Sequence, residues 1–177
     1  MTWKPTFVLF AVLLASLAAG CGGGDSSSSD TTTAAKAAPN QRFTQEQWTQ
    51  YKADVTAFQN LNDSTLVKVT ACTKPINPPP GAMSNCVGDS LTNLGAATEK
   101  VGQTLEALTS SVGGACLTAV NGLLNYVRPY QASINSLQNT IDSDNYAAAY
   151  SASSSMKTAR AHGRAANTEV MAACAPA

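Results

Sequence analysis

Apolar residues recur every three or four positions in four separate stretches of this chain, the spacing of one face of an α-helix. These stripes run from Trp48 to Cys72, from Val87 to Val112, from Leu117 to Ile141 and from Ala149 to Ala173. Stretches of about 26 to 30 residues give helices of roughly 40 to 45 Å, similar enough to cover one another end to end. Because short connections make neighbouring helices antiparallel, the sequence predicts an all-α, up-down-up-down four-helix bundle.

The ends of the predicted helices carry capping signals, and two interior positions leave alternatives open. Thr44 and Gln47 have the spacing of a capping box at the start of the first helix. The first stretch either runs unbroken or breaks near Asn62, because Asp63 and Ser64 could cap a separate second helix. Pro129 predicts either a kink or two shorter helices. The fourth helix is expected to open after the capping candidates at 142–144.

Small residues mark two of the stripes. Gly88, Gly95 and Gly102 recur every seven residues in the second stretch, and each costs roughly 0.8 to 1 kcal/mol relative to Ala in a helix. We therefore expect a neighbouring helix to approach closely at these glycines. The fourth stripe consists mainly of Ala and Gly, so the core there depends on larger side chains from its neighbours.

The first twenty residues have the pattern of a secretory signal. Lys4 precedes an apolar run from Phe7 to Ala19, and small residues follow. The run of 13 residues is shorter than the roughly 20 that a membrane-spanning helix needs. A signal that is removed is therefore the better interpretation than a permanent transmembrane anchor.

The end of this signal carries a recognisable motif. Leu17, Ala18, Ala19 and Gly20 before Cys21 resemble the lipobox of bacterial lipoproteins, although Ala18 stands where Leu is commonest. The resemblance implies that residues 1–20 are cleaved and that Cys21 is acylated, which anchors the exported chain to membrane lipid. Because Gly22 is not the Asp of many retained Gram-negative lipoproteins, the resemblance favours the outer-membrane or cell-surface face. The alternative is an ordinary cleaved signal in which Cys21 is incidental.

The segment after Cys21 divides the chain into regions. Residues 22–38 are rich in Gly, Ser and Thr and show no apolar periodicity, which is typical of a flexible tether. The predicted organisation is a signal at 1–20, a lipidated cysteine and tether at 21–40, and a bundle domain at 41–177.

Four cysteines beyond Cys21 test the predicted topology. An even number in an exported domain favours two disulfides. The bundle places Cys72 and Cys86 at its membrane-distal end and Cys116 and Cys174 at the other end. Any other pairing would join cysteines roughly 40 Å apart, whereas a disulfide needs Cα atoms within about 7 Å. The sequence therefore predicts Cys72–Cys86 and Cys116–Cys174 bridges.

Charge and histidine content argue against several classes of function. Eleven Lys and Arg residues balance eleven Asp and Glu residues, and no basic tract exists to follow a nucleic-acid backbone. His162 is the one histidine in the chain, and no motif for haem attachment, zinc binding or a catalytic serine accompanies it. We therefore expect no metal, no cofactor and no enzymatic activity.

One candidate binding element is the connection between the first two helices. Residues 73–85 include Pro75, Pro78, Pro79 and Pro80, which favour an extended conformation that binds grooves at low entropic cost. The alternative is a stiff crossover that only spaces the two helices.

A second candidate binding element lies along the fourth helix. At helical spacing, Tyr146 and Tyr150 precede Lys157, Arg160 and Arg164, and this set could hold an acidic or ring-bearing ligand. The alternative is boundary tyrosines next to a solvated row of cations.

Two functional hypotheses follow from these features. The first is a non-enzymatic interaction or structural module of the cell envelope, which contacts an envelope protein at its distal end. The second is a carrier that holds a small hydrophobic or cofactor-like ligand between the small-residue faces of the second and fourth helices.

Overall fold

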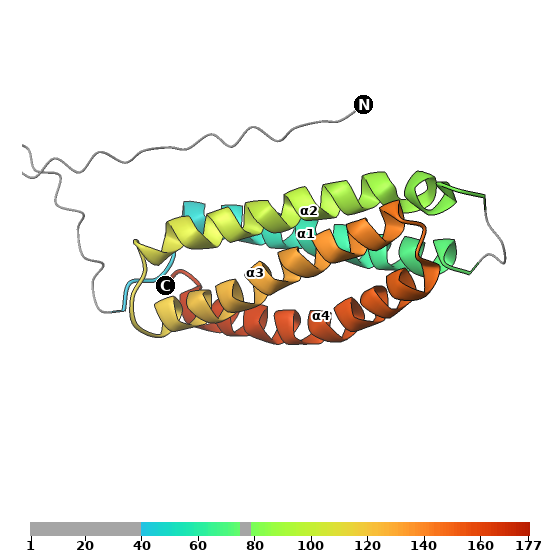
Figure 1. The fold of residues 1–177 in the computed structure, drawn as a ribbon. Helices are drawn as coiled ribbons and strands as arrows, with labels where there is room; N and C mark the ends of the chain where they lie inside the picture. Colours follow the sequence, from blue (N-terminus) through green and yellow to red (C-terminus); the bar gives the residue numbers. More distant parts are fainter. Residues whose placement is uncertain (1–39, 75–78) are drawn as a thin grey trace, which may run out of the picture. The chain divides into compact units, whose positions relative to one another are not determined.

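The computed structural model describes residues 40–74 and 79–177, which form four α-helices and no β-strand. The helices are α1 (Gln45–Cys72), α2 (Ala82–Thr109), α3 (Gly114–Asp142) and α4 (Tyr146–Cys174). Figure 1 shows them running alternately up and down, each packed on the next, with α4 returning beside α1. The predicted all-α four-helix bundle is confirmed. The signal, Cys21, the tether, Pro75 and Pro78 lie outside the described residues.

The two ends of the bundle are named here by their position relative to residue 40. The proximal end carries the start of α1, the α2–α3 connection and the end of α4, and the distal end carries residues 72–86 and 142–146. Backbone hydrogen bonds hold the proximal end together. The Phe43 N–H donates to the Cys174 carbonyl at 3.2 Å, and the Gly113 N–H donates to the Gln41 carbonyl at 2.9 Å.

The first helix begins as predicted and does not break. The Thr44 hydroxyl accepts from the Gln47 N–H at 3.2 Å, and the Gln47 side chain accepts from the Thr44 N–H at 2.9 Å. Asn62 lies inside α1, where its buried side chain accepts a hydrogen bond from the Tyr130 hydroxyl. Asp63 and Ser64, the candidate caps of a second helix, bond elsewhere: Asp63 pairs with Arg160 and Arg164 of α4, and the Ser64 hydroxyl donates to the Leu61 carbonyl.

The third helix is continuous through Pro129, so the alternative of two shorter helices is wrong. Proline removes one backbone hydrogen bond, here the one to the carbonyl of Asn125. Both residues are exposed, so water can satisfy that carbonyl.

The fourth helix begins one residue later than the predicted caps allow. Its N-cap is Asn145, whose side chain accepts from the Ala148 N–H at 3.1 Å. Asp144 instead adopts a left-handed φ of 51°, and its carboxylate accepts from the Gly81 N–H at 2.6 Å. The α3–α4 turn is thereby bonded to the start of α2.

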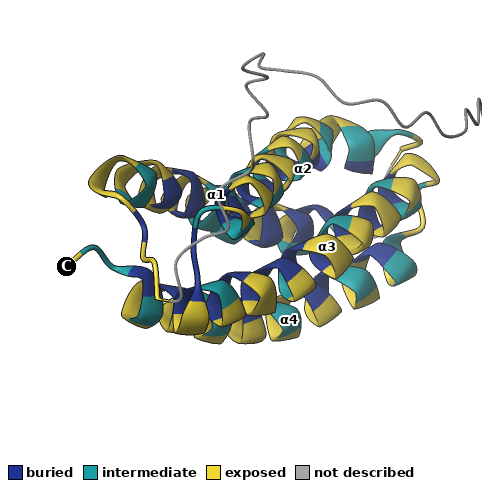
Figure 2. Ribbon diagram, turned by 90° about the vertical axis from the view of Figure 1, so that its left-hand side faces the viewer, coloured by how far each residue is buried: buried dark blue, intermediate teal, exposed yellow. Residues whose placement is uncertain are grey.

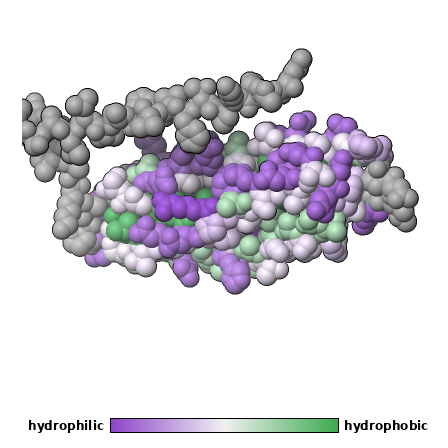
Figure 3. Space-filling model, in the orientation of Figure 1, coloured by the Kyte–Doolittle hydropathy of each residue, from purple (hydrophilic) through white to green (hydrophobic). Residues whose placement is uncertain are grey.

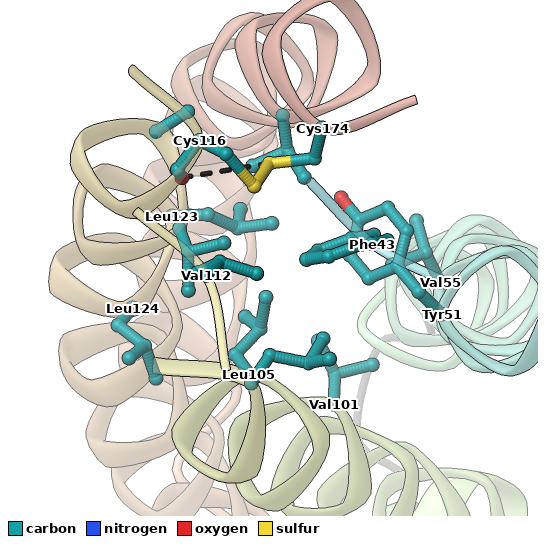
Figure 4. Close-up of a cluster of buried hydrophobic side chains, with 14 of the residues drawn as sticks. Phe43, Tyr51, Val55, Val101, Leu105, Val112, Cys116, Leu123, Leu124 and Cys174 are labelled. Atoms are coloured by element: carbon teal, nitrogen blue, oxygen red, sulfur yellow. Dashed lines mark hydrogen bonds between the residues drawn. A yellow bond between two sulfur atoms is a disulfide. The ribbon is translucent and has the colours of Figure 1, made fainter. Parts of the chain in front are cut away.

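The core divides into two clusters along the bundle, and buried residues line the inward faces of the helices (Figure 2). The proximal cluster groups Phe43 and Tyr51 with Leu105 and Leu123 around the Cys116–Cys174 disulfide (Figure 4). The distal cluster contains aliphatic side chains of α2 and α3 together with Tyr130. As predicted, α4 contributes mainly small residues, with Met156 and Val170 as its largest buried side chains.

Both predicted disulfides are present. Cys72 and Cys86 have Cα atoms 6.2 Å apart, and Cys116 and Cys174 have Cα atoms 4.8 Å apart. The first bridge links α1 to α2, and the second links α3 to α4. The disulfides therefore divide the bundle into two covalently closed helical hairpins.

The expected close approach at the seven-residue glycines does not occur. A Cβ atom at Gly95 or Gly102 would lie 3.6 Å from its nearest α3 neighbour, an ordinary van der Waals distance. Gly88 meets only Ser84 of its own helix. The close approach occurs instead at Gly163 of α4, where an added Cβ would lie 2.3 Å from the Tyr126 ring of α3.

Candidate functional site

Polar side chains bridge α1 and α4, the neighbouring helix pair that shares the fewest contacts in the bundle. We call this region the α1–α4 seam; it comprises Asp63 and Thr70 of α1 with Lys157, Arg160 and Arg164 of α4. Arg160 Nη1 lies 2.5 Å from Asp63 Oδ1, and Arg164 Nη2 lies 3.1 Å from Asp63 Oδ2. Lys157 Nζ donates to the Thr70 hydroxyl at 2.8 Å. Two guanidinium groups thus pair with one carboxylate, and one ammonium group bonds a hydroxyl of the same helix as that carboxylate.

These cations are only partly shielded from solvent. The Arg160 side chain is 33% exposed and the Arg164 side chain is 54% exposed. Each guanidinium has five N–H donors and each ammonium has three, so the single bonds to Asp63 and Thr70 leave most of their donor capacity for other acceptors. The seam therefore has N–H donors to spare for an anion.

A narrow cavity lies beneath the seam, inside the bundle. All four helices contribute to its lining, with Val55, Phe58, Gln59, Asn62 and Asp63 from α1, Val101 from α2, Leu123, Tyr126 and Val127 from α3, and Arg160, Gly163, Arg164 and Asn167 from α4. Its volume of about 20 Å³ is enough for about one water molecule. The cavity is thus apolar on its floor and cationic at its mouth.

Aromatic side chains form one wall of this cavity. The rings of Tyr126 and Tyr130 stack with centroids 5.3 Å apart, and Phe58 meets Tyr130 edge to face at 5.8 Å. The Tyr130 hydroxyl donates to Asn62 Oδ1 at 2.5 Å. Burial raises the pKa of Tyr126 to about 12, against an opposing effect of the Arg160 charge. The Tyr126 phenol therefore stays neutral at physiological pH.

The structure divides the residues that were predicted as one face of the fourth helix. Lys157, Arg160 and Arg164 meet at the seam, so the alternative of a merely solvated row of cations is incomplete, because all three bond to α1. Tyr150 is 56% exposed and lies about 15 Å along the helix axis from Arg160 at 1.5 Å per residue. Tyr146 packs against the distal core. The tyrosines therefore do not share a site with the cations.

The other predicted element is partly described. Pro79 and Pro80 are exposed beside Gly81, whose N–H is bonded to Asp144. The buried Asp144 Oδ1 and the Tyr146 hydroxyl have no hydrogen-bond partner among the described residues. The distal end thus joins the α1–α2 and α3–α4 connections into one surface.

The remaining surface offers few chemical groups of note. His162 is exposed on α4. The described residues include no cluster of three or more His, Cys, Asp or Glu side chains suited to a metal ion, and none of their helices is both long and apolar enough to cross a membrane. Figure 3 shows hydrophilic residues interspersed with small hydrophobic patches on the face that it displays.

Sequence reasoning missed the α1 partners of the site. Asp63 was considered only as a helix cap, and Tyr126 was not singled out. The negative charge of Asp63 could have indicated its role. Asp63 is a carboxylate within a helix that is antiparallel to one with three cations. Because Asp63 and Arg160 are 97 positions apart in the chain, no local sequence pattern indicates the pair.

Comparison of the chain with known protein families, with curated proteins and with solved structures found no match.

Proposed function

We propose that the chain is an exported lipoprotein, anchored to membrane lipid by acylated Cys21, whose bundle acts as a non-enzymatic interaction module at the outer-membrane or cell-surface face. The lipobox-like residues before Cys21 and the Gly-, Ser- and Thr-rich segment that follows support the anchor. The bundle is the part that meets a partner in the cell envelope.

The bond between Gly81 and Asp144 carries the choice of the distal end as the contact surface. Together with the Cys72–Cys86 bridge, it holds the segments 79–81 and 142–146 in one arrangement. A surface ordered before binding loses less conformational entropy when a partner docks. Since residue 40 enters at the proximal end, the distal end is also the one that a tether leaves open to partners.

Site-specific photo-crosslinking in the producing cell tests this role. A photoreactive residue at position 80 should give a discrete envelope-protein adduct that Pro79→Ser diminishes while helicity stays unchanged. Position 176 is the matched control, since Pro176 lies at the proximal end. Equal adducts from both positions, or an adduct from position 176 alone, would contradict the distal assignment.

The cavity beneath the α1–α4 seam favours a second candidate function, a carrier for a small ligand. Among its lining residues are Val101 of α2 and Gly163 of α4, the two helices between which the sequence placed a ligand. The largest share of the lining, however, belongs to α1 and α4. Native mass spectrometry tests the carrier: a bound mass that is lost on denaturation supports this function, and a consistently bare protein opposes it.

A further inference from the structure

We propose that the α1–α4 seam binds a single-chain carboxylate, with its head group on Lys157, Arg160 and Arg164 and its apolar chain between α1 and α4. This inference rests on the carrier function and names its class of ligand. It uses the charge at the mouth of the cavity, the lining below, and the distribution of the disulfides.

The charge at the mouth selects an anion. Arg160 and Arg164 share the single carboxylate of Asp63, whereas Lys157 bonds the neutral hydroxyl of Thr70. No second carboxylate among the described residues pairs with any of these cations. The planar guanidinium fork matches the geometry of a carboxylate, which can accept two parallel N–H bonds. A cationic or neutral head group would gain no comparable bonds at this position.

The lining below the mouth selects an apolar chain. Val55 and Phe58 of α1, together with Leu123 and Val127 of α3, face the cavity. From Val55 to Asp63 the helix advances about 12 Å, close to the length of an extended octanoate chain. A chain placed along this path would remove its own surface from water as well as that of the lining.

The disulfides leave this seam as the place where the bundle can open. Cys72–Cys86 ties α1 to α2 and Cys116–Cys174 ties α3 to α4, whereas no covalent bond among the described residues ties α1 to α4. The cavity of about 20 Å³ is too small for a chain, so α1 and α4 must separate to admit one. This movement must rearrange the partly exposed bonds of Arg160, Arg164 and Lys157. It must also rearrange the bond that the Tyr51 hydroxyl of α1 donates to Asn167 of α4.

Thermal unfolding of the full chain in uncharged phosphatidylcholine vesicles, followed by circular dichroism, tests the inference. Octanoate should raise the unfolding midpoint because it binds only the folded state, whereas octanol and octyltrimethylammonium should not. The double variant Arg160→Gln/Arg164→Gln should bind octanoate at least about tenfold more weakly, because it lacks the charge-assisted hydrogen bonds of both guanidinium groups.

Arg128→Gln is the matched control. Arg128 also forms an exposed ion pair, 2.9 Å from Glu106, but it lies away from the seam, so this variant should keep full octanoate affinity. The comparison of the three amphiphiles on the unaltered chain does not depend on how well any variant folds.

The outcomes separate the inference from the function on which it rests. Equal stabilisation by octanol or by octyltrimethylammonium would keep the carrier and overturn the carboxylate head group. Undiminished octanoate affinity in the double variant would overturn the head-group site in the same way. If phosphatidylglycerol vesicles abolish the octanoate effect, the head group of a membrane lipid is the ligand, and the single-chain assignment is wrong. No shift with any amphiphile would overturn the carrier and the inference together.

Discussion

Tyr126 and Gly163 decide, as single residues, how closely α3 can pack on α4. A Cβ atom at position 163 would lie 2.3 Å and 2.4 Å from two carbons of the Tyr126 ring. The ring cannot turn away freely, because it stacks on Tyr130. Gly163 is therefore a packing requirement, unlike Gly122, around which an added Cβ would meet nothing within 4 Å.

Replacing Gly163 with Ala should lower the free energy of unfolding by about 1 to 3 kcal/mol, the usual cost of overpacking a core. Gly122→Ala, also inside a helix, should instead raise it by about 0.5 to 1 kcal/mol, because Ala is the better helix former. Urea denaturation measures both values. A Gly163→Ala chain as stable as the Gly122→Ala chain would show that α3 and α4 do not depend on this contact.

Asp54 is a second residue whose surroundings predict a measurable effect. Its side chain is 4% exposed and lies 2.7 Å from Lys100 Nζ. Burial opposes its ionisation, but hydrogen bonds from Gln50, Lys100 and Thr104 and the charge of Lys100 together outweigh burial, so the pKa of Asp54 falls below 3.8. A pKa lowered by folding contributes stability above the unfolded value, and this contribution is lost as the pH falls through the folded value.

Asp54→Asn should therefore destabilise the bundle by about 1 to 3 kcal/mol at pH 7, because a buried charged acceptor is lost. The difference from the unaltered chain should shrink below about pH 4, where Asp54 itself becomes protonated on unfolding. Urea denaturation at pH 7 and pH 3 measures this trend. A stability difference that is constant between these two pH values would contradict the role assigned to the ionised carboxylate.

The two disulfides, each of which closes one helical hairpin, differ in how far the fold shields them from solvent. Cys116 and Cys174 are 2% and 0% exposed, within the proximal core. Cys72 is 7% exposed, whereas Cys86 lies in an exposed position on the first turns of α2. Thiol–disulfide exchange requires access to a sulfur atom, so the distal bridge is the more reactive one.

Mild reduction of the folded chain should therefore open Cys72–Cys86 before Cys116–Cys174. Alkylation of the released thiols followed by peptide mass spectrometry identifies the bridge that opens. Loss of the distal bridge, which spans 14 residues, should lower stability by about 3 kcal/mol in the chain-entropy description. Reduction of both bridges at one rate would show that the bundle must unfold before either is reached.

The sequence predicted the elements well because their signals are periodic and local. The apolar stripes placed all four helices, and the bundle then allowed one arrangement of the bridges among Cys72, Cys86, Cys116 and Cys174. The continuity of α1 was not predictable, since Asp63, a plausible cap by type, pairs instead with Arg160, 97 residues away. Asp144 was a plausible cap by type, but its partner, the Gly81 N–H, lies 63 residues away.

The candidate site was predictable only in part, because its partners also lie far apart in the sequence. Lys157, Arg160 and Arg164 were identified from their spacing on one helix. Their partners Asp63 and Thr70 depend on the axial register of α1 against α4, which apolar periodicity does not fix. Tyr146 and Tyr150 lie further along α4 from these cations, and their part in binding a partner stays a prediction.

The whole chain joins a proposed lipid anchor to a bundle made of two disulfide-closed hairpins. The proposed anchor would keep the domain at a membrane, and an exported location would allow both bridges to persist. The proposed interaction surface and the proposed carboxylate site both presuppose this location. Both proposals therefore depend on the anchor.

Intact mass spectrometry of the chain purified from the membrane fraction of the producing cell tests the anchor. We expect a chain that begins at Cys21 and carries acyl groups on that residue. Its mass should be lower than that of its reduced form by the four hydrogens lost in two disulfides. A chain with an unmodified Cys21, or one that begins elsewhere and is recovered only in the soluble fraction, would contradict it.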